Sequence, residues 1–175
     1  VVPGASTFSG VAAFAGFGLT GKKHGEIVLF TELGSGPLPA QDPKTTLVFL
    51  SGADEAPAIA AELMDAGYAA TTPIGVTRAG STVDQRTLVS TLGEVTKAAK
   101  AAKLAGPGTV VVGDAVSARD SLNWFETKPL FGWRVLIPRT REQAGAVTAQ
   151  LVPYGAVGVE VPTISVEPPR TPQQM

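Results

Sequence analysis

The sequence predicts an α/β protein, because short apolar runs typical of strands alternate with segments typical of helices. This alternation extends to about residue 126, and a new strand, helix and strand follow Lys128 and Pro129. The last residues, 167–175, contain three prolines and no further core segment. We therefore expect a domain with a five-strand sheet at 1–126. A linker and the incomplete start of a second α/β domain are expected at 127–175.

The strands of the first domain are expected where apolar residues cluster between turn-forming residues. Their ranges are 26–31, 45–50, 72–77, 86–90 and 109–112. The second strand, TTLVFL, is apolar almost throughout, which indicates that both of its faces are buried. Because such strands are typical of parallel sheets, we expect parallel pairing around it.

The helices of the first domain are expected at 5–15, 54–66, 92–104 and 117–122. Small residues dominate the first helix, and they allow a helix to lie close to a sheet or a ligand. The second helix has an apolar face and ends before Gly67, which is a typical stop signal. In the second domain, a helix at 141–151 lies between strands at 134–138 and 157–161.

Composition and charge exclude several classes of function. The 44% of hydrophobic residues is enough for a buried core, so we do not expect disorder. Lys plus Arg is 14 and Asp plus Glu is 15, which gives no electrostatic argument for a nucleic acid or an anionic membrane as partner. The absence of cysteine excludes disulfides and thiolate metal sites. With His24 as the only histidine, we expect neither a histidine-based triad nor a metal site.

The start of the chain, residues 1–19, is apolar, so a signal peptide or a membrane span has to be considered. A signal peptide has basic residues before its apolar run, whereas Lys22 and Lys23 follow it here. Pro3 and the glycines of this stretch also argue against a membrane span. We therefore expect a cytoplasmic protein without a membrane segment.

The segment GFGLTGKK at 16–23 has the G-x-G-x-x-G spacing of dinucleotide-binding loops and nearly matches a phosphate-binding P-loop. Both motifs require a strand before the glycines and a helix after them, and the order expected here is the reverse. Lys23 also stands where a P-loop has Ser or Thr. We therefore interpret the segment as a turn, and the neighbouring His24 as a surface residue.

Three glycines, Gly52, Gly80 and Gly113, follow or lie near the ends of expected strands. Glycine at such a place lets a ligand approach the backbone, in the crevice where α/β folds bind small molecules. A plain turn needs glycine equally, and the residues alone favour the turn. Asp54 and Glu55 are expected to cap the helix that they begin.

Five short stretches occur in a characteristic order: VPG at 2–4 with the helix of small residues, TLVFLSG at 46–52, RAGSTVDQR at 78–86, VVVG at 110–113 and LNWF at 122–125. In this order and spacing they resemble the C-terminal half of uroporphyrinogen-III C-methyltransferases. The resemblance covers residues 1–126, and its specificity comes from the order and spacing of the whole set.

The resemblance implies an enzyme that transfers two methyl groups from S-adenosyl-L-methionine to ring carbons of uroporphyrinogen III. The product is precorrin-2, a precursor of sirohaem and cobalamin, and S-adenosyl-L-homocysteine is released. Enzymes of this kind have two α/β domains with the cofactor folded in the cleft between them, usually in a homodimer. Their glycine-rich cofactor loop and their acid and base residues belong to the N-terminal half. We therefore expect no catalytic residue in this chain, and the fragment alone is expected to be inactive.

The resemblance assigns cofactor contacts to six positions: Ser6, Thr7, Ser51, Gly80, Gly108 and Thr109. Relatives often have Met at position 51, so Ser51 replaces a thioether by a small hydroxyl. The tetrapyrrole substrate carries carboxylates, which guanidinium groups bind well. Substrate contacts are therefore expected at Arg78, Arg86 and Arg119, with surface ion pairs as the alternative role of these arginines.

The second part of the chain contains GWRVLIPR at 132–139, EQA at 142–144 and VPTI at 161–164. With these stretches it resembles the start of a uroporphyrinogen-III synthase. The two enzymes act consecutively on one tetrapyrrole, so we expect a fusion of both in the native protein. Too few residues are present for synthase activity.

Two alternatives stay open at this point. The first is another corrinoid or precorrin methyltransferase of the same fold, which product analysis would distinguish. The second is a non-catalytic module for dimerisation, which light scattering with and without S-adenosyl-L-homocysteine would distinguish.

Overall fold

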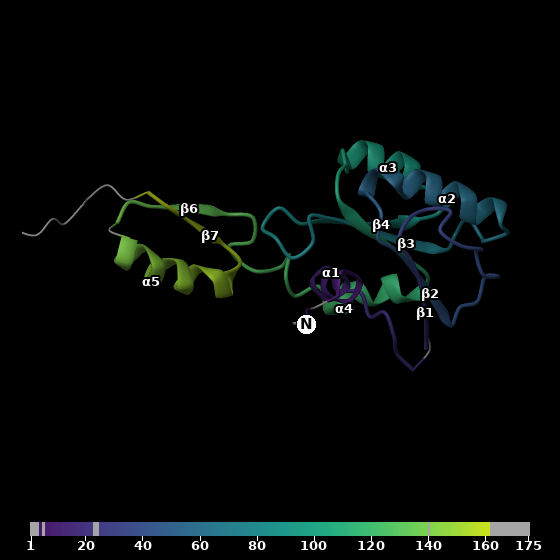
Figure 1. The fold of residues 1–175 in the computed structure, drawn as a ribbon, viewed down its shortest axis with the longest axis horizontal. Helices are drawn as coiled ribbons and strands as arrows, with labels where there is room; N and C mark the ends of the chain where they lie inside the picture. Colours follow the sequence, from purple (N-terminus) through teal and green to yellow (C-terminus); the bar gives the residue numbers. More distant parts are fainter. Residues whose placement is uncertain (1–3, 5, 23–24, 140, 162–175) are drawn as a thin grey trace, which may run out of the picture. The chain divides into compact units, whose positions relative to one another are not determined.

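The chain divides into two compact units, one ending at Thr127 and one beginning at Lys128 (Figure 1). The computed structural model describes residues 4, 6–22, 25–139 and 141–161, without the side chains of 141 and 142. His24, expected at the surface, lies outside the described residues.

The first unit contains the expected five-strand sheet, with the strand order β1-β2-β5-β3-β4. Its strands are β1 Glu26–Phe30, β2 Thr45–Phe49, β3 Pro73–Arg78, β4 Arg86–Thr91 and β5 Gly108–Val112. The expectation of parallel pairing around β2 is correct only on one side. β2 runs parallel to β1 but antiparallel to β5, and β3 is antiparallel to both β5 and β4. The sheet is therefore mixed.

The central strands are buried on both faces, as their apolar sequences predict. Leu47 and Phe49 of β2 belong to one core, whereas Val48 between them belongs to the other. In β5, Val110 and Val112 face the first core and Val111 faces the second. Because successive side chains of a strand point to opposite faces, each strand needs apolar residues at every position. The continuous apolar runs of β2 and β5 are explained by burial of both faces of the sheet under helices, and not by parallel pairing.

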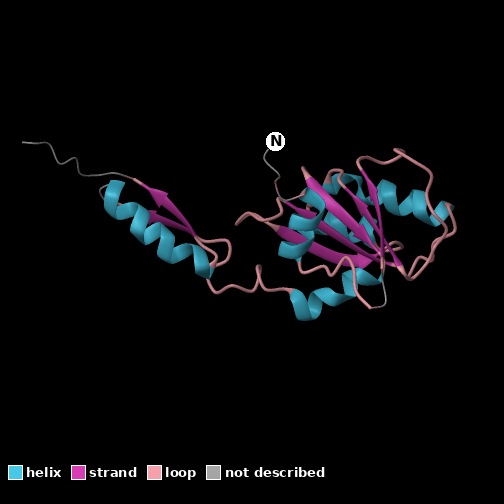
Figure 2. Cartoon of the chain, turned by 60° about the horizontal axis from the view of Figure 1, so that its bottom comes forward, coloured by secondary structure: helices cyan, strands magenta, loops and turns pink. Residues whose placement is uncertain are grey.

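Helices cover both faces of this sheet (Figures 1 and 2). On one face lie α2 Ala56–Asp65 and α3 Val95–Ala102, which bury Ile59, Leu63 and Val95 against the sheet. On the other face lies α1 Thr7–Ala15, which buries Ala12 and Ala15. Removing a side chain the size of Leu63 from water contributes about 1.5–3 kcal/mol of stability. The small residues of α1 contribute less, but they bring the helix backbone close to the sheet.

Helix boundaries differ from the expected ones at the start of α2. A short 3-10 helix, Ala53–Glu55, precedes α2, and Pro57 lies in the first turn of α2. Asp54 does not cap this helix as expected, because its Oδ1 accepts a hydrogen bond from the Gly106 backbone N–H at 3.3 Å. The contact ties the turn before β5 to the segment after β2, and both segments belong to the candidate site.

The last elements of the first unit are the 3-10 helix Asp114–Ala118 and α4 Arg119–Leu122, in place of the single helix expected at 117–122. Gly16 ends α1 in the left-handed conformation, with φ of +77°. A helix therefore precedes the 16–21 glycines and β1 follows them, so the order agrees with a turn and not with a phosphate-binding loop. Among the described helices, none combines the length and the apolar character needed to span a bilayer.

The second unit contains β6 Arg134–Ile137, α5 Arg141–Leu151 and β7 Val157–Glu160. β6 and β7 pair in parallel, with Val135 opposite Gly158. One face of the pair meets α5, where Thr148 lies 3.2 Å from Glu160 and close to Gly158. Side chains of the opposite face are exposed, among them Leu136, Val157 and Val159. A two-strand sheet with one bare face has little buried area to stabilise it.

We expect limited trypsin digestion to cut the second unit first. Arg134 and Arg139 are exposed and lie in this small unit, which opens locally at low cost. Mass spectrometry of early fragments should place the cuts beyond Lys128, since Pro129 follows Lys128 and trypsin cuts poorly before proline. Lys97, Lys100 and Lys103 of the first unit are a matched control, because they are equally exposed but lie on or next to α3, which is anchored by Val95. Early cutting within residues 45–113 would contradict this prediction.

Candidate functional site

An open cavity of about 510 Å³ lies at the end of the five-strand sheet where β2 and β3 finish and β5 begins. Because β5 runs antiparallel to both neighbours, its first residues lie beside their last ones. The lining comes from Thr7 and Val11 of α1, from residues 50–52 after β2, from the stretch between Thr77 and Thr82, and from residues 107–109. Four segments that are distant in the sequence therefore build one site.

Five of the six residues expected to contact a cofactor line this cavity: Thr7, Ser51, Gly80, Gly108 and Thr109. Ser6 is not among the lining residues. It is the residue before α1, and its carbonyl accepts bonds from the Gly10 N–H and the Ser9 hydroxyl. The sequence resemblance thus selects residues that the fold brings together, and their contact with a cofactor stays a prediction.

Two hydroxyl groups in this lining are buried without a hydrogen-bond partner among the described residues. Ser51 is 6% exposed and Thr109 is 1% exposed, and neither Oγ of Ser51 nor Oγ1 of Thr109 is paired. Other buried hydroxyls of the sheet are paired, as Thr46 Oγ1 donates to the Leu19 carbonyl at 3.1 Å. Buried polar groups in native proteins are nearly always satisfied, so the two hydroxyls favour a ligand with polar atoms in this cavity.

The loop after β3 has a backbone conformation that is unusual for its residues. Ala79 has a φ of +49° and Ser81 a φ of +65°, although neither is glycine. The loop is held by the Ala79 N–H, which donates to the Pro107 carbonyl, and by the Thr82 hydroxyl, which donates to the Ala79 carbonyl. Left-handed conformations of this kind persist only where surrounding contacts enforce them, and they are frequent at ligand sites.

The glycines of the lining serve close packing between the walls of the cavity. A Cβ on Gly80 would lie 2.7 Å from both methyl carbons of Val11, so its missing side chain faces α1 and not the cavity. A Cβ on Gly108 would lie 2.7 Å from the Thr77 carbonyl oxygen. Gly52 also lines the cavity, whereas Gly113, with a φ of +122°, lies at the opposite end of β5. The sequence identified these positions, but the physical reason is contact between elements.

None of the three arginines expected to bind substrate lines this cavity. Arg78 and Arg86 are opposite each other at the ends of β3 and β4, and Arg86 donates to the Gln85 carbonyl at 2.7 Å. Arg119 is mostly buried and forms an ion pair with Glu126 at 2.7 Å, and it also donates to the Ala15 carbonyl. The ion pair gives Arg119 a structural role, and substrate contact by the three side chains stays a prediction.

Sequence reasoning missed several lining residues: Val11, Leu50, Thr77, Ala79, Thr82 and Pro107. The spacing of four between Thr7 and Val11 is a usable signal, because residues i and i+4 share one face of a helix. Leu50, Thr77 and Ala79 are next to residues that were identified. Pro107 looked like part of a simple turn, and its role becomes evident only in the fold, where its carbonyl accepts a hydrogen bond from the Ala79 N–H.

In the described part of the chain, no group of three or more side chains that could hold a metal ion occurs. A second, smaller cavity of about 180 Å³ lies at the opposite end of the sheet, beside Tyr68 and Gly113. Burial raises the pKa of the Tyr68 phenol, which donates to the Pro39 carbonyl at 2.9 Å. Tyr68 therefore keeps its proton and stabilises the packing of this region through its hydrogen bond to Pro39.

Comparison with known proteins connects this chain to one family. The sequence model of the tetrapyrrole (corrin/porphyrin) methylases matches residues 1–96. The chain is 39% identical over 133 residues to siroheme synthase of Azotobacter vinelandii (strain DJ / ATCC BAA-1303), which is 72% of this chain and 29% of that protein. It is 33% identical to the porphyrin biosynthesis protein HemD of Ruminiclostridium josui, over 70% of this chain and 24% of that protein. The chain thus spans less than a third of these curated relatives.

Solved structures agree with this comparison. Uroporphyrin-III C-methyltransferase from Thermus thermophilus, complexed with S-adenosyl homocysteine, is 28% identical with a TM-score of 0.51, over 67% of this chain and 53% of that chain. Cobalt precorrin-4 methyltransferase matches with a TM-score of 0.54 at 21% identity, over 66% of this chain and 52% of that chain, which is a likeness of fold.

Proposed function

Since the chain belongs to the tetrapyrrole (corrin/porphyrin) methylase family, we propose that it supplies one wall of the cofactor site of a uroporphyrinogen-III C-methyltransferase. The proposed reaction places two methyl groups on ring carbons of uroporphyrinogen III and yields precorrin-2, for sirohaem or cobalamin synthesis. The observation that carries the proposal is the cavity with two buried, unpaired hydroxyls, on Ser51 and Thr109. A similar enzyme holds S-adenosyl homocysteine, and similar curated proteins are siroheme synthases.

The residues of this wall have properties that fit S-adenosyl-L-methionine. The hydroxyls of Ser51 and Thr109 offer hydrogen bonds to polar atoms of such a ligand, because neither is used within the described protein. Gly80 and Gly108 expose backbone to the cavity, and Val11 with Leu50 adds apolar surface that excludes water. When bound, S-adenosyl-L-methionine would supply an electrophilic methyl group on its sulfonium. The contribution of these residues is to bind and orient.

The proposal also covers the oligomeric state, the three arginines and the second unit of the chain. We propose that the native protein is a cytoplasmic homodimer and that Arg78, Arg86 and Arg119 lie near substrate carboxylates. The second unit is proposed to be the start of a uroporphyrinogen-III synthase. The parallel strand-helix-strand arrangement of β6, α5 and β7 is compatible with such a start.

The proposal predicts that Ser51→Ala and Thr109→Val in the intact gene product weaken binding of S-adenosyl-L-homocysteine. Loss of one hydrogen bond corresponds to about two- to tenfold in the dissociation constant for each variant. The thermal midpoint without ligand should not fall, because neither hydroxyl has a partner to lose among the described residues. Isothermal titration calorimetry and thermal unfolding measure both quantities.

Thr46→Val is the matched control for this experiment. Its hydroxyl is equally buried but paired with the Leu19 carbonyl, and Thr46 does not line the cavity. The substitution should therefore lower the stability of the free protein and leave the dissociation constant unchanged. Unchanged affinity in both cavity variants, or an equal loss in Thr46→Val, would refute the proposed site.

A further inference from the structure

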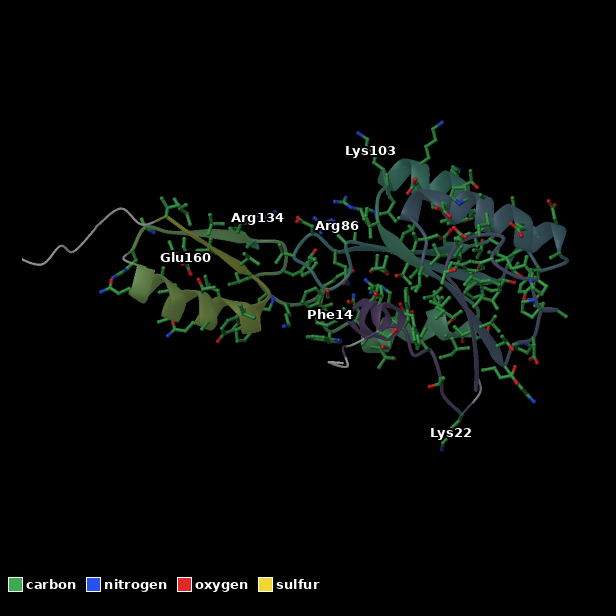
Figure 3. All side chains as sticks on the ribbon, viewed as in Figure 1. Phe14, Lys22, Arg86, Lys103, Arg134 and Glu160 are labelled. Carbon is green, nitrogen blue, oxygen red and sulfur yellow. The ribbon has the colours of Figure 1, made fainter. Side chains whose placement is uncertain are left out.

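Gln85 is a fully buried polar residue whose side chain joins three separate segments. Its Oε1 accepts a hydrogen bond from the Ser81 backbone N–H at 2.8 Å. Its Nε2 donates to the Phe14 carbonyl at 3.1 Å and to Oε1 of Glu126 at 2.8 Å. Figure 3 marks Phe14, near the end of α1, and Arg86, which directly follows Gln85 in the sequence.

Glu126 extends this network to Arg119. One carboxylate oxygen of Glu126 accepts from Gln85, and the other accepts from Nη2 of Arg119 at 2.7 Å. Arg119 also donates to the Ala15 carbonyl, the last residue of α1. Gln85 and Arg119 thus donate hydrogen bonds to two neighbouring carbonyls in the last turn of α1. Carbonyls at the end of a helix have no N–H partner within the helix, so these bonds come from other segments.

The two ends of the Gln85 side chain hold two walls of the cavity. Ser81 lies in the loop that contributes Ala79, Gly80 and Thr82 to the lining, and it has the left-handed φ of +65°. Phe14 lies on α1, which contributes Thr7 and Val11. Only a side-chain amide offers an acceptor and two donors on one planar group, so Glu, Lys or Leu at position 85 cannot make the same three bonds.

We infer that Gln85 is a positioning residue of the ligand cavity, which fixes the loop of residues 79–82 against α1 through its bonds to Ser81, Phe14 and Glu126. The inference rests on the proposed function for the identity of the ligand. It assigns Gln85 no contact with cofactor or substrate, because Gln85 does not line the cavity. Loss of the amide should release the Ser81 amide and the strained loop first, and ligand affinity should fall because the loop must then be ordered on binding.

The test compares Gln85→Leu with the unchanged intact gene product. Hydrogen exchange of the loop amides, Ser81 above all, should become at least about tenfold faster, since its protecting acceptor is lost. The dissociation constant of S-adenosyl-L-homocysteine should rise about tenfold at a temperature where both proteins are folded. Gln41→Leu is the matched control. Gln41 also ties its own segment to another one, because its Nε2 donates to the Thr72 hydroxyl and its Oε1 accepts from the Ala69 N–H. It is more exposed than Gln85 and lies beside the smaller cavity at the other end of the sheet. It should leave both readings unchanged.

A rescue experiment keeps the inference testable if Gln85→Leu does not fold. Gln85→Glu places a second carboxylate beside Glu126, and the double variant Gln85→Glu/Glu126→Gln removes that repulsion and restores one donor between the two side chains. Affinity and loop protection should fall in the single variant and recover in part in the double variant. Unchanged loop exchange in Gln85→Leu, faster exchange with unchanged affinity, or no recovery in the double variant would overturn the inference. If the unchanged protein does not bind S-adenosyl-L-homocysteine, the proposed function fails, whereas the exchange data still decide whether Gln85 fixes the loop.

Discussion

Gly80→Val is expected to reduce binding of S-adenosyl-L-homocysteine to the intact gene product by about a hundredfold or more, and the cause is displacement of α1. A Cβ at this position would lie 2.7 Å from the two methyl carbons of Val11, and valine adds two further methyl groups. Overpacking of this kind costs about 1–3 kcal/mol, and it moves Thr7 and Val11 away from the other walls of the cavity. A misplacement of about 1 Å can cost a hundredfold in function. Calorimetric titration measures the affinity.

Gly10→Ala on the same helix is the control for Gly80→Val. Apart from its own helix backbone and chain neighbours, no atom of the described structure lies within 4 Å of the Cβ that it would add, and alanine is favoured over glycine within a helix by about 0.5–1 kcal/mol. We expect Gly10→Ala to raise the stability of the first unit and to leave the affinity unchanged. If Gly80→Val binds the ligand as tightly as Gly10→Ala, contact between Gly80 and α1 does not control the cavity.

The strands of the fold could be predicted well because burial leaves a direct mark on the sequence. LVFL at 47–50 and the three valines of β5 form continuous apolar runs, and β2 and β5 are indeed buried on both faces. The direction of their pairing leaves no such mark. β5 is covered by helices on both faces in the same way whether it runs parallel or antiparallel to β2. Direction depends on the connections between strands, and the expectation of parallel pairing was wrong for this reason.

Residues of the candidate site could be predicted where they belong to short sequence motifs. Contacts between residues that are far apart in the sequence could not. Ser51, Gly80 and Thr109 were identified from local stretches, and the fold brings all three to one cavity. Gln85 lies within one of these stretches but was not singled out, because its partners Phe14 and Glu126 are 71 and 41 residues away in the sequence. Arg119 was assigned by charge type, and its pairing with Glu126 becomes evident only in the fold.

The chain of 175 residues alone is expected to show no measurable methylation of uroporphyrinogen III, whereas the intact gene product should be active. The chain spans 29% of a similar siroheme synthase and 53% of a similar uroporphyrin-III C-methyltransferase chain, so about half of such a methyltransferase chain has no counterpart here. Positioning of reacting groups supplies about 7–11 kcal/mol of the barrier reduction in enzymes, and one wall of a cavity cannot hold two reactants in line.

Mass spectrometry of the methylated products from both proteins, at equal concentrations of enzyme and S-adenosyl-L-methionine, measures this difference. A binding assay beside it serves as a control for folding. Weak binding of S-adenosyl-L-homocysteine by the chain alone, reduced by Thr109→Val, would demonstrate that the wall is formed although turnover is absent. Each lost tenfold in affinity corresponds to about 1.4 kcal/mol of missing contacts. Comparable turnover in the short and the long protein would mean that residues 1–175 contain the catalytic groups, and the assignment of this chain as one wall of the site would then be wrong.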